Sequence, residues 1–97
     1  MVKNVGLTLS YRALMRHLFE VLLLHNKNVV EVHKLFGLMF NVIWYQRKLK
    51  ETTDVDQTKQ IQESVENAKS DLGELMHAWC LEYGDRNVIW ALINKTV

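Results

Sequence analysis

The chain has 97 residues, of which 48% are hydrophobic and 24% are charged, and it contains four glycines and no proline. A chain of this size holds one domain with a single core, and this composition excludes a disordered protein or a loop-rich β-sandwich. The net charge of +1 excludes a strongly basic or acidic protein. We therefore expect residues 1–97 to form one helical domain.

A first helix is predicted at about residues 10–25. Ser10 is a suitable N-cap, and apolar side chains follow it at steps of three and four residues. Arg12, Arg16 and Glu20 interrupt the apolar residues, so the pattern indicates neither a signal peptide nor a membrane span. The single cysteine, Cys80, cannot form an internal disulfide, which favours a cytoplasmic protein.

A second helix is predicted at about residues 29–51, because Asn28 and Glu31 have the spacing of a capping box. The stretch NVVEVHKLFGLMFNVIWY from Asn28 to Tyr45, which covers most of this helix, has almost no polar face. A helix that is apolar all round must be buried. We expect the rest of the bundle or a partner protein to cover it.

A third helix is predicted at about residues 56–83 and a short last helix at about 86–95. Asp54 is the expected N-cap of the third helix, and Gly84 its left-handed C-cap. Its apolar residues recur in a heptad-like seam: Ile61, Val65, Ala68, Leu72, Leu75 and Trp79. The predicted fold is all-α, a four-helix bundle built round a long antiparallel hairpin of the second and third helices.

Two glycines lie in the middle of the two long helices. If the hairpin turns near Thr53, Gly37 and Gly73 fall at the same level. Glycine is unfavourable inside a helix, so the pair predicts a close approach of the two backbones.

The charges are unevenly distributed along the chain. Residues 1–50 carry eight cationic residues and two acids, whereas residues 51–75 carry seven acids and two lysines. Opposite charges on packed helices attract, so we expect the two parts to face each other. Arg47, Lys48 and Lys50 form a cationic cluster, but such residues also suit the C-terminal end of a helix. The sequence therefore does not favour nucleic-acid binding.

The side chains that could carry chemistry form no recognisable site. His17, His25 and His33 are eight residues apart, and this spacing places no two of them one turn apart, as metal ligands on a helix would be. His77 and Cys80 could share a helix face, but no third group orients them, which favours a structural cysteine. We predict no catalytic residue, no metal site and no cofactor, and the sequence favours a non-enzymatic protein.

The segment VHKLFG, with His33 and Gly37, resembles the His-x-Leu-Lys-Gly signature of histidine-phosphotransfer domains, which are four-helix bundles of about this length. The resemblance implies that His33 accepts a phosphoryl group and that Gly37 leaves room for a response-regulator domain. The alternative interpretation is a structural histidine packed near Gly73. A second segment, WCLEYGDRNVIWALI, resembles the last two helices of death-fold domains, which have six helices.

The aromatic residues of the second helix support a different function. Phe36, Phe40, Trp44 and Tyr45 point in more directions than a bundle of this size covers. Exposed aromatic side chains are the usual anchors of protein interfaces. The leading prediction is an adaptor, assembly factor or inhibitor that binds a protein partner through these four residues and forms a homodimer. Phosphotransfer through His33 is the alternative.

Overall fold

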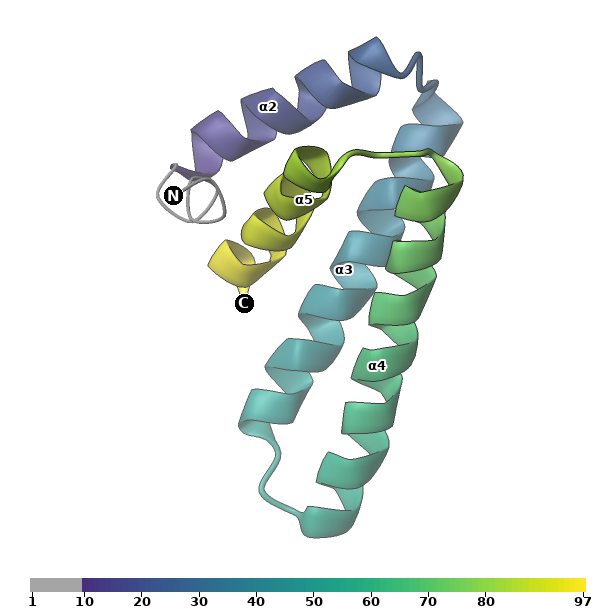
Figure 1. The fold of residues 1–97 in the computed structure, drawn as a ribbon. Helices are drawn as coiled ribbons and strands as arrows, with labels where there is room; N and C mark the ends of the chain where they lie inside the picture. The colour runs from purple at the N-terminus through teal and green to yellow at the C-terminus, as the bar shows by residue number, and fades with distance from the viewer. Residues whose placement is uncertain (1–9) are drawn as a thin grey trace.

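The computed structural model describes residues 10–97, which form four helices: α2 (Tyr11–Leu24), α3 (Val29–Glu51), α4 (Val55–Ala78) and α5 (Tyr83–Thr96). The predicted all-α fold is confirmed. Figure 1 shows α3 and α4 as a long antiparallel hairpin, with α2 and α5 on one side of the half that is remote from the α3–α4 turn. The four helices form a bundle in which α4 packs on α3, α2 packs on α5, and α5 packs on α3.

The first three helices begin at the N-caps that the sequence predicts. The Ser10 hydroxyl accepts a hydrogen bond from the Ala13 N–H at 3.2 Å. The Asn28 side chain accepts from the Glu31 N–H at 2.8 Å, and the Glu31 carboxylate accepts from the Asn28 N–H at 3.3 Å, which completes a capping box. The Asp54 carboxylate accepts from the Asp56 N–H at 2.8 Å. Side-chain caps therefore fix these three starting points.

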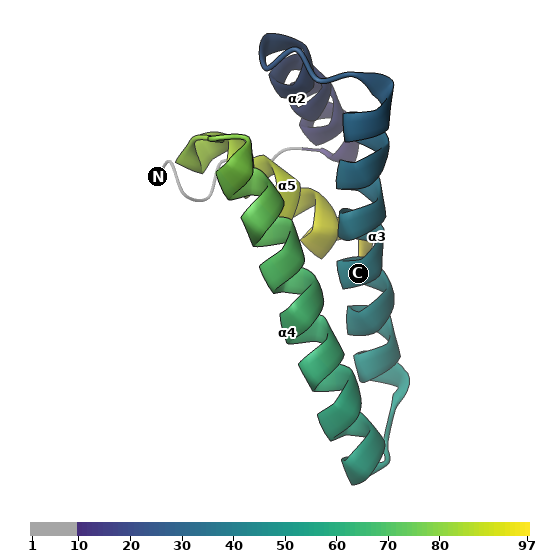
Figure 2. The same cartoon turned by 90° about the vertical axis from the view of Figure 1, so that its right-hand side faces the viewer.

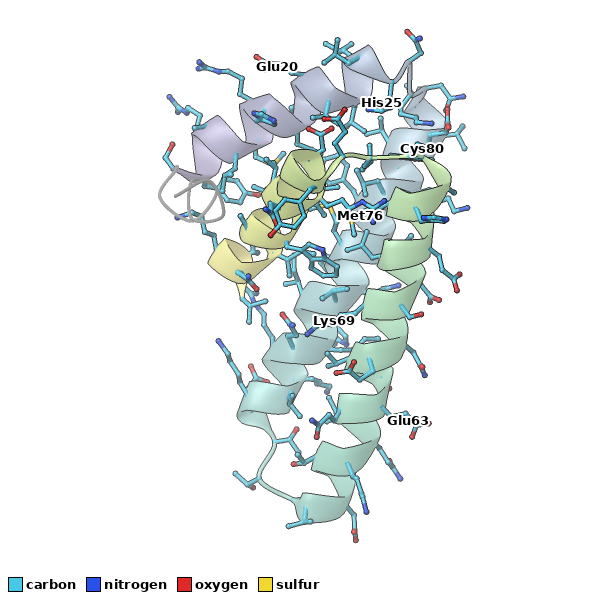
Figure 3. All side chains as sticks on the ribbon, viewed as in Figure 1. Glu20, His25, Glu63, Lys69, Met76 and Cys80 are labelled. Atoms are coloured by element: carbon cyan, nitrogen blue, oxygen red, sulfur yellow. The ribbon has the colours of Figure 1, made fainter. Side chains whose placement is uncertain are left out.

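The end of α4 differs from its predicted end at residue 83. The helix stops at Ala78 because Cys80 adopts the left-handed conformation, with φ 56°. The Cys80 N–H bonds to the His77 carbonyl at 2.9 Å and the Leu81 N–H to the Met76 carbonyl at 3.1 Å, which is a Schellman motif. The prediction that Gly84 is the left-handed C-cap of this helix is wrong, because Gly84 lies in the first turn of α5. Figure 3 labels Met76 and Cys80 at this end of α4.

The core lies where the four helices meet, near the α2–α3 and α4–α5 connections. Leu81, which follows the end of α4, is buried, so this connection is anchored in the core. The cluster of buried apolar side chains consists of Leu14, Leu18, Val21, Leu22, Leu35, Met39, Val42, Ala68, Leu72, Leu75, Met76, Leu81, Val88, Ile89, Ala91, Leu92 and Ile93. Figure 2, turned by 90°, shows that α5 reaches α3 while the far half of the α3–α4 hairpin extends beyond it.

The apolar helix α3 is not buried all round by its own bundle. Only Leu35, Met39 and Val42 are buried, and they lie on the side that meets α4 and α5. A helix touched on one side by two neighbours leaves its opposite side open, whatever the residues there. None of the helices in residues 10–97 is both long and apolar enough to cross a membrane.

Two further expectations from the sequence fail in the structure. A Cβ atom added at Gly37 or at Gly73 would meet no other helix of residues 10–97 within 4 Å, so the glycines do not mark a close approach of α3 and α4. The opposite charges of these helices form no ion pair within residues 10–97; the pairs there are His17 with Asp85 and Lys27 with Glu31. The hairpin is held by apolar packing.

Candidate functional surface

The open side of α3 carries both sets of residues that the sequence singles out. His33, Gly37, Phe40 and Trp44 follow one another at steps of four, three and four, which places them on one face of the helix. All four residues are exposed, and Phe40 and Trp44 keep 61% and 52% of their surface open to solvent. This face lies opposite the buried side of α3.

Aromatic rings contact one another along this side of α3. The rings of Phe40 and Trp44 are stacked, with centroids 6.5 Å apart and planes 19° apart. The Lys48 ammonium lies 5.7 Å from the centroid of the Trp44 ring, within the range of a cation–π interaction. Phe36 is half-buried, and its ring lies 6.3 Å from the ring of Phe19 on α2. The aromatic surface therefore continues from α3 onto α2.

An apolar groove of about 270 Å³ connects the two helices. Tyr11 and Met15 of α2 line one side and Phe36, Phe40 and Ile43 of α3 line the other. Three further residues complete the lining: Met39, Leu92 and Thr96. The Thr96 carbonyl accepts a hydrogen bond from the Arg47 guanidinium at 2.6 Å. Because most of its lining residues are apolar, the groove can receive apolar side chains of another protein.

We call this region the α2–α3 apolar surface, made of Tyr11, Met15, Phe19, Phe36, Phe40, Ile43 and Trp44. Of the four predicted partner-binding residues, Phe36, Phe40 and Trp44 belong to it. Tyr45 does not, because it is half-buried on the other side of α3, in a hollow shared with Asn41 and with Ser64 of α4. The structure thus brings three of the four residues together.

The contribution of α2 to this surface is missing from the sequence-based prediction. Tyr11, Met15, Phe19 and Leu23 follow one another at steps of four residues, beside the row of Leu14, Leu18 and Leu22 that enters the core. Because α2 has few neighbouring helices, they cannot cover both apolar rows, and part of its apolar surface stays exposed. Only the position of α2 beside Phe36 shows that this exposed apolar surface adjoins the aromatic residues of α3.

The predicted phosphoryl acceptor, His33, is exposed, and Gly37 stands one turn away with open space around it. The interpretation of His33 as a histidine packed near Gly73 does not fit this exposure. Cys80 is also exposed. Within residues 10–97, no group of three or more His, Cys, Asp and Glu side chains is placed to hold a metal ion, and no polar or charged residue is buried.

In comparisons with known proteins, no family model, no curated protein and no solved structure matches the chain. Function is therefore inferred from the side chains of the α2–α3 apolar surface and from the exposed imidazole beside it. Both lie on the same side of α3, so a ligand of one would approach the other.

Proposed function

We propose that the protein is a non-enzymatic interaction protein, an adaptor, assembly factor or inhibitor, that binds a protein partner through the α2–α3 apolar surface. The observation that carries the proposal is the stacked and exposed pair of Phe40 and Trp44. Large aromatic side chains in the open cost free energy in water and are enriched among the anchors of interfaces. A cytoplasmic location belongs to the proposal, because the single cysteine requires no oxidising compartment.

The size of the surface supports this function. Tyr11, Phe19, Phe40 and Trp44 are each about half exposed. At roughly 100 Å² of open surface apiece, they present about 400 Å² before Met15, Phe36 and Ile43 are added. This area falls in the range of about 300–600 Å² that is typical of the largest apolar patch on a monomer, which is often functional.

Self-association is the form of binding that we propose first, because it requires no partner other than the chain itself. Sedimentation equilibrium should give a homodimer at tens of micromolar. The variant Phe40→Ser/Trp44→Ser should sediment as a monomer at the same concentration. Val55→Ser is the matched control, since Val55 is an exposed apolar residue at the start of α4, away from this surface.

Two results would contradict this proposal. A wild-type chain that stays monomeric up to several hundred micromolar would overturn self-association. Equal weakening of the dimer by Val55→Ser and by the double variant would overturn the assignment to the α2–α3 apolar surface.

Phosphotransfer through His33 is the second candidate, supported by the exposure of His33 and the open space at Gly37. In this reaction an imidazole nitrogen would attack the phosphorus of a phosphorylated response regulator. A new N–P bond forms while the O–P bond to the regulator's aspartate breaks, and the carboxylate leaves. The apolar neighbours Phe36 and Phe40 offer the phosphoryl group no hydrogen bond, so we rank this function below protein binding.

A labelled, phosphorylated response regulator tests this second function. The wild-type chain should acquire the label, and His33→Gln should not. His77→Gln, which removes another exposed histidine on α4, should be labelled like the wild type. Equal labelling of the wild type and His33→Gln would end the assignment.

A further inference from the structure

A second seam runs along the outside of α3, in addition to the row that packs against α4 and α5. Its residues follow at steps of three, four, three, four and three, the spacing by which one helix packs along another. All of them are exposed. This outer row consists of Val30, His33, Gly37, Phe40, Trp44 and Arg47.

Gly37 occupies the middle of the outer row, and the packing of residues 10–97 does not require a glycine there. Glycine is one of the poorest residues inside a helix, and none of the neighbouring helices in residues 10–97 comes within 4 Å of a Cβ atom placed there. A residue without a side chain allows another backbone to come close. The space beside Gly37 is therefore open to a helix of another molecule.

The charges of α3 select the direction of a second helix. Arg47, Lys48 and Lys50 gather at its C-terminal end. Two parallel copies would bring six cations together at one end, whereas two antiparallel copies hold the clusters at opposite ends. In a parallel dimer the Phe40 and Trp44 rings of both copies would meet at the same level of the interface. In the antiparallel arrangement the two aromatic pairs lie on opposite sides of the glycines.

We propose that a second copy of this chain packs antiparallel on the outer row of α3, with the two-fold axis at Gly37. This inference rests on the proposed function and names its partner. Val30 then lies level with the partner's Trp44, and His33 lies level with the partner's Asn41. Such an interface is isologous, because the same residues face each other from both copies.

The available area is sufficient for such a dimer. Val29, Val30, Phe40 and Trp44 are at least half exposed, and so are the neighbouring Leu23 and Tyr11. With Phe19 they contribute roughly 100 Å² each, or about 700 Å² per copy and about 1,400 Å² in total. Stable interfaces bury about 1,200–2,000 Å².

Disulfide trapping tests the axis. In a Cys80→Ser background, which removes the one native thiol, Gly37→Cys should form a covalent dimer on mild oxidation. Its two Cα atoms face each other across the axis, within the roughly 7 Å that a disulfide spans. Asn41→Cys is the matched control: its two copies lie about 12 Å apart along the helices, at 1.5 Å per residue, and should not be bridged.

A second measurement does not depend on disulfide chemistry. Gly37→Leu should raise the dimer dissociation constant at least about tenfold, because the added side chain blocks the approach of the partner helix. Asn41→Leu, off the axis, should change it by less. Circular dichroism of both variants at low concentration checks that the monomers fold.

The results distinguish this inference from the proposed function. A wild-type dimer in which Asn41→Cys is bridged as readily as Gly37→Cys would overturn the antiparallel axis and leave protein binding intact. The axis would also be wrong if Gly37→Leu dimerised like the wild type. A wild-type chain that is monomeric at several hundred micromolar would overturn both the axis and self-association.

Discussion

Two non-glycine residues, Asn26 and Cys80, adopt the left-handed conformation in residues 10–97, and each ends a helix. At α2 the Asn26 N–H bonds to the Leu23 carbonyl, and at α4 the Cys80 N–H bonds to the His77 carbonyl. Asparagine tolerates this conformation better than most residues, whereas cysteine has no side-chain group that favours it. The strain is therefore expected to be greater at Cys80.

Replacing Cys80 by glycine should raise the free energy of unfolding by about 1 kcal/mol, because the steric penalty of the left-handed conformation disappears. For a domain of this size the melting temperature would rise by about 4–8 °C. Thermal and urea unfolding followed by circular dichroism measure the change. Asn26→Gly should gain less, and Cys80→Ala, which keeps a Cβ atom, should gain nothing. An equal gain in both cysteine variants would point to the thiol and not to the backbone.

Among the four helices of residues 10–97, only α5 begins without a side-chain cap. Glu82 occupies its N-cap position without a side-chain hydrogen bond to the helix, unlike Ser10, Asn28 and Asp54 at the other three starts. The carboxylate of Asp85, in the first turn of α5, does not cap the helix. Its Oδ1 atom lies 3.8 Å from the Nε2 atom of His17. The first N–H groups of α5 therefore donate no hydrogen bond to the side chain at the N-cap position.

Shortening Glu82 to aspartate should stabilise the protein by about 0.5–1 kcal/mol, because aspartate is among the preferred N-cap residues and the charge stays the same. Urea unfolding of Glu82→Asp against the wild type measures the gain. The reverse change at a working cap, Asn28→Ala, should cost about 1 kcal/mol. A stability unchanged in Glu82→Asp would mean that water satisfies these N–H groups equally well.

Replacing either mid-helix glycine by alanine should change the stability of the monomer alike, but only the change at Gly37 should affect dimerisation. Open space surrounds both, so Gly37→Ala and Gly73→Ala should each stabilise the monomer by roughly 0.5–1 kcal/mol through helix propensity. Unfolding at low micromolar concentration measures this gain. At high concentration Gly37→Ala should weaken dimerisation and Gly73→Ala should not. Loss of stability in either monomer would show that its glycine is needed within the chain.

The starts of α2, α3 and α4 could be predicted from the sequence because short-range caps determine them. The end of α4 could not, since Gly84 is the better left-handed residue by composition and the burial of Leu81, a long-range effect, favours a turn at Cys80. For the same reason the sequence places Phe36, Phe40 and Trp44 on an apolar helix but does not show that α2 supplies Phe19 beside them. Which apolar residues stay exposed depends on the packing of other helices.

At the scale of the whole molecule, burial is confined to one half of the long hairpin. Val42 on α3 and Val65 on α4 are the last buried side chains before the turn, and none between them is buried. Leu49 and Ile61 are only half-buried there. The other half packs against α2 and α5, so the hairpin consists of an anchored part and a projecting part.

The projecting part should open independently of the rest. A fully buried aliphatic side chain contributes about 1.5–3 kcal/mol, and two helices without such side chains are marginal in water. Amide hydrogen exchange should therefore show protection factors at residues 46–62 at least about tenfold lower than at Val88–Ile93, where five of the six side chains are buried. Because the proposed dimer axis lies at Gly37, raising the protein concentration should increase protection around residues 33–41 and leave the region near the turn unchanged. Uniform protection along both long helices would instead mean that the hairpin unfolds as one unit with the core.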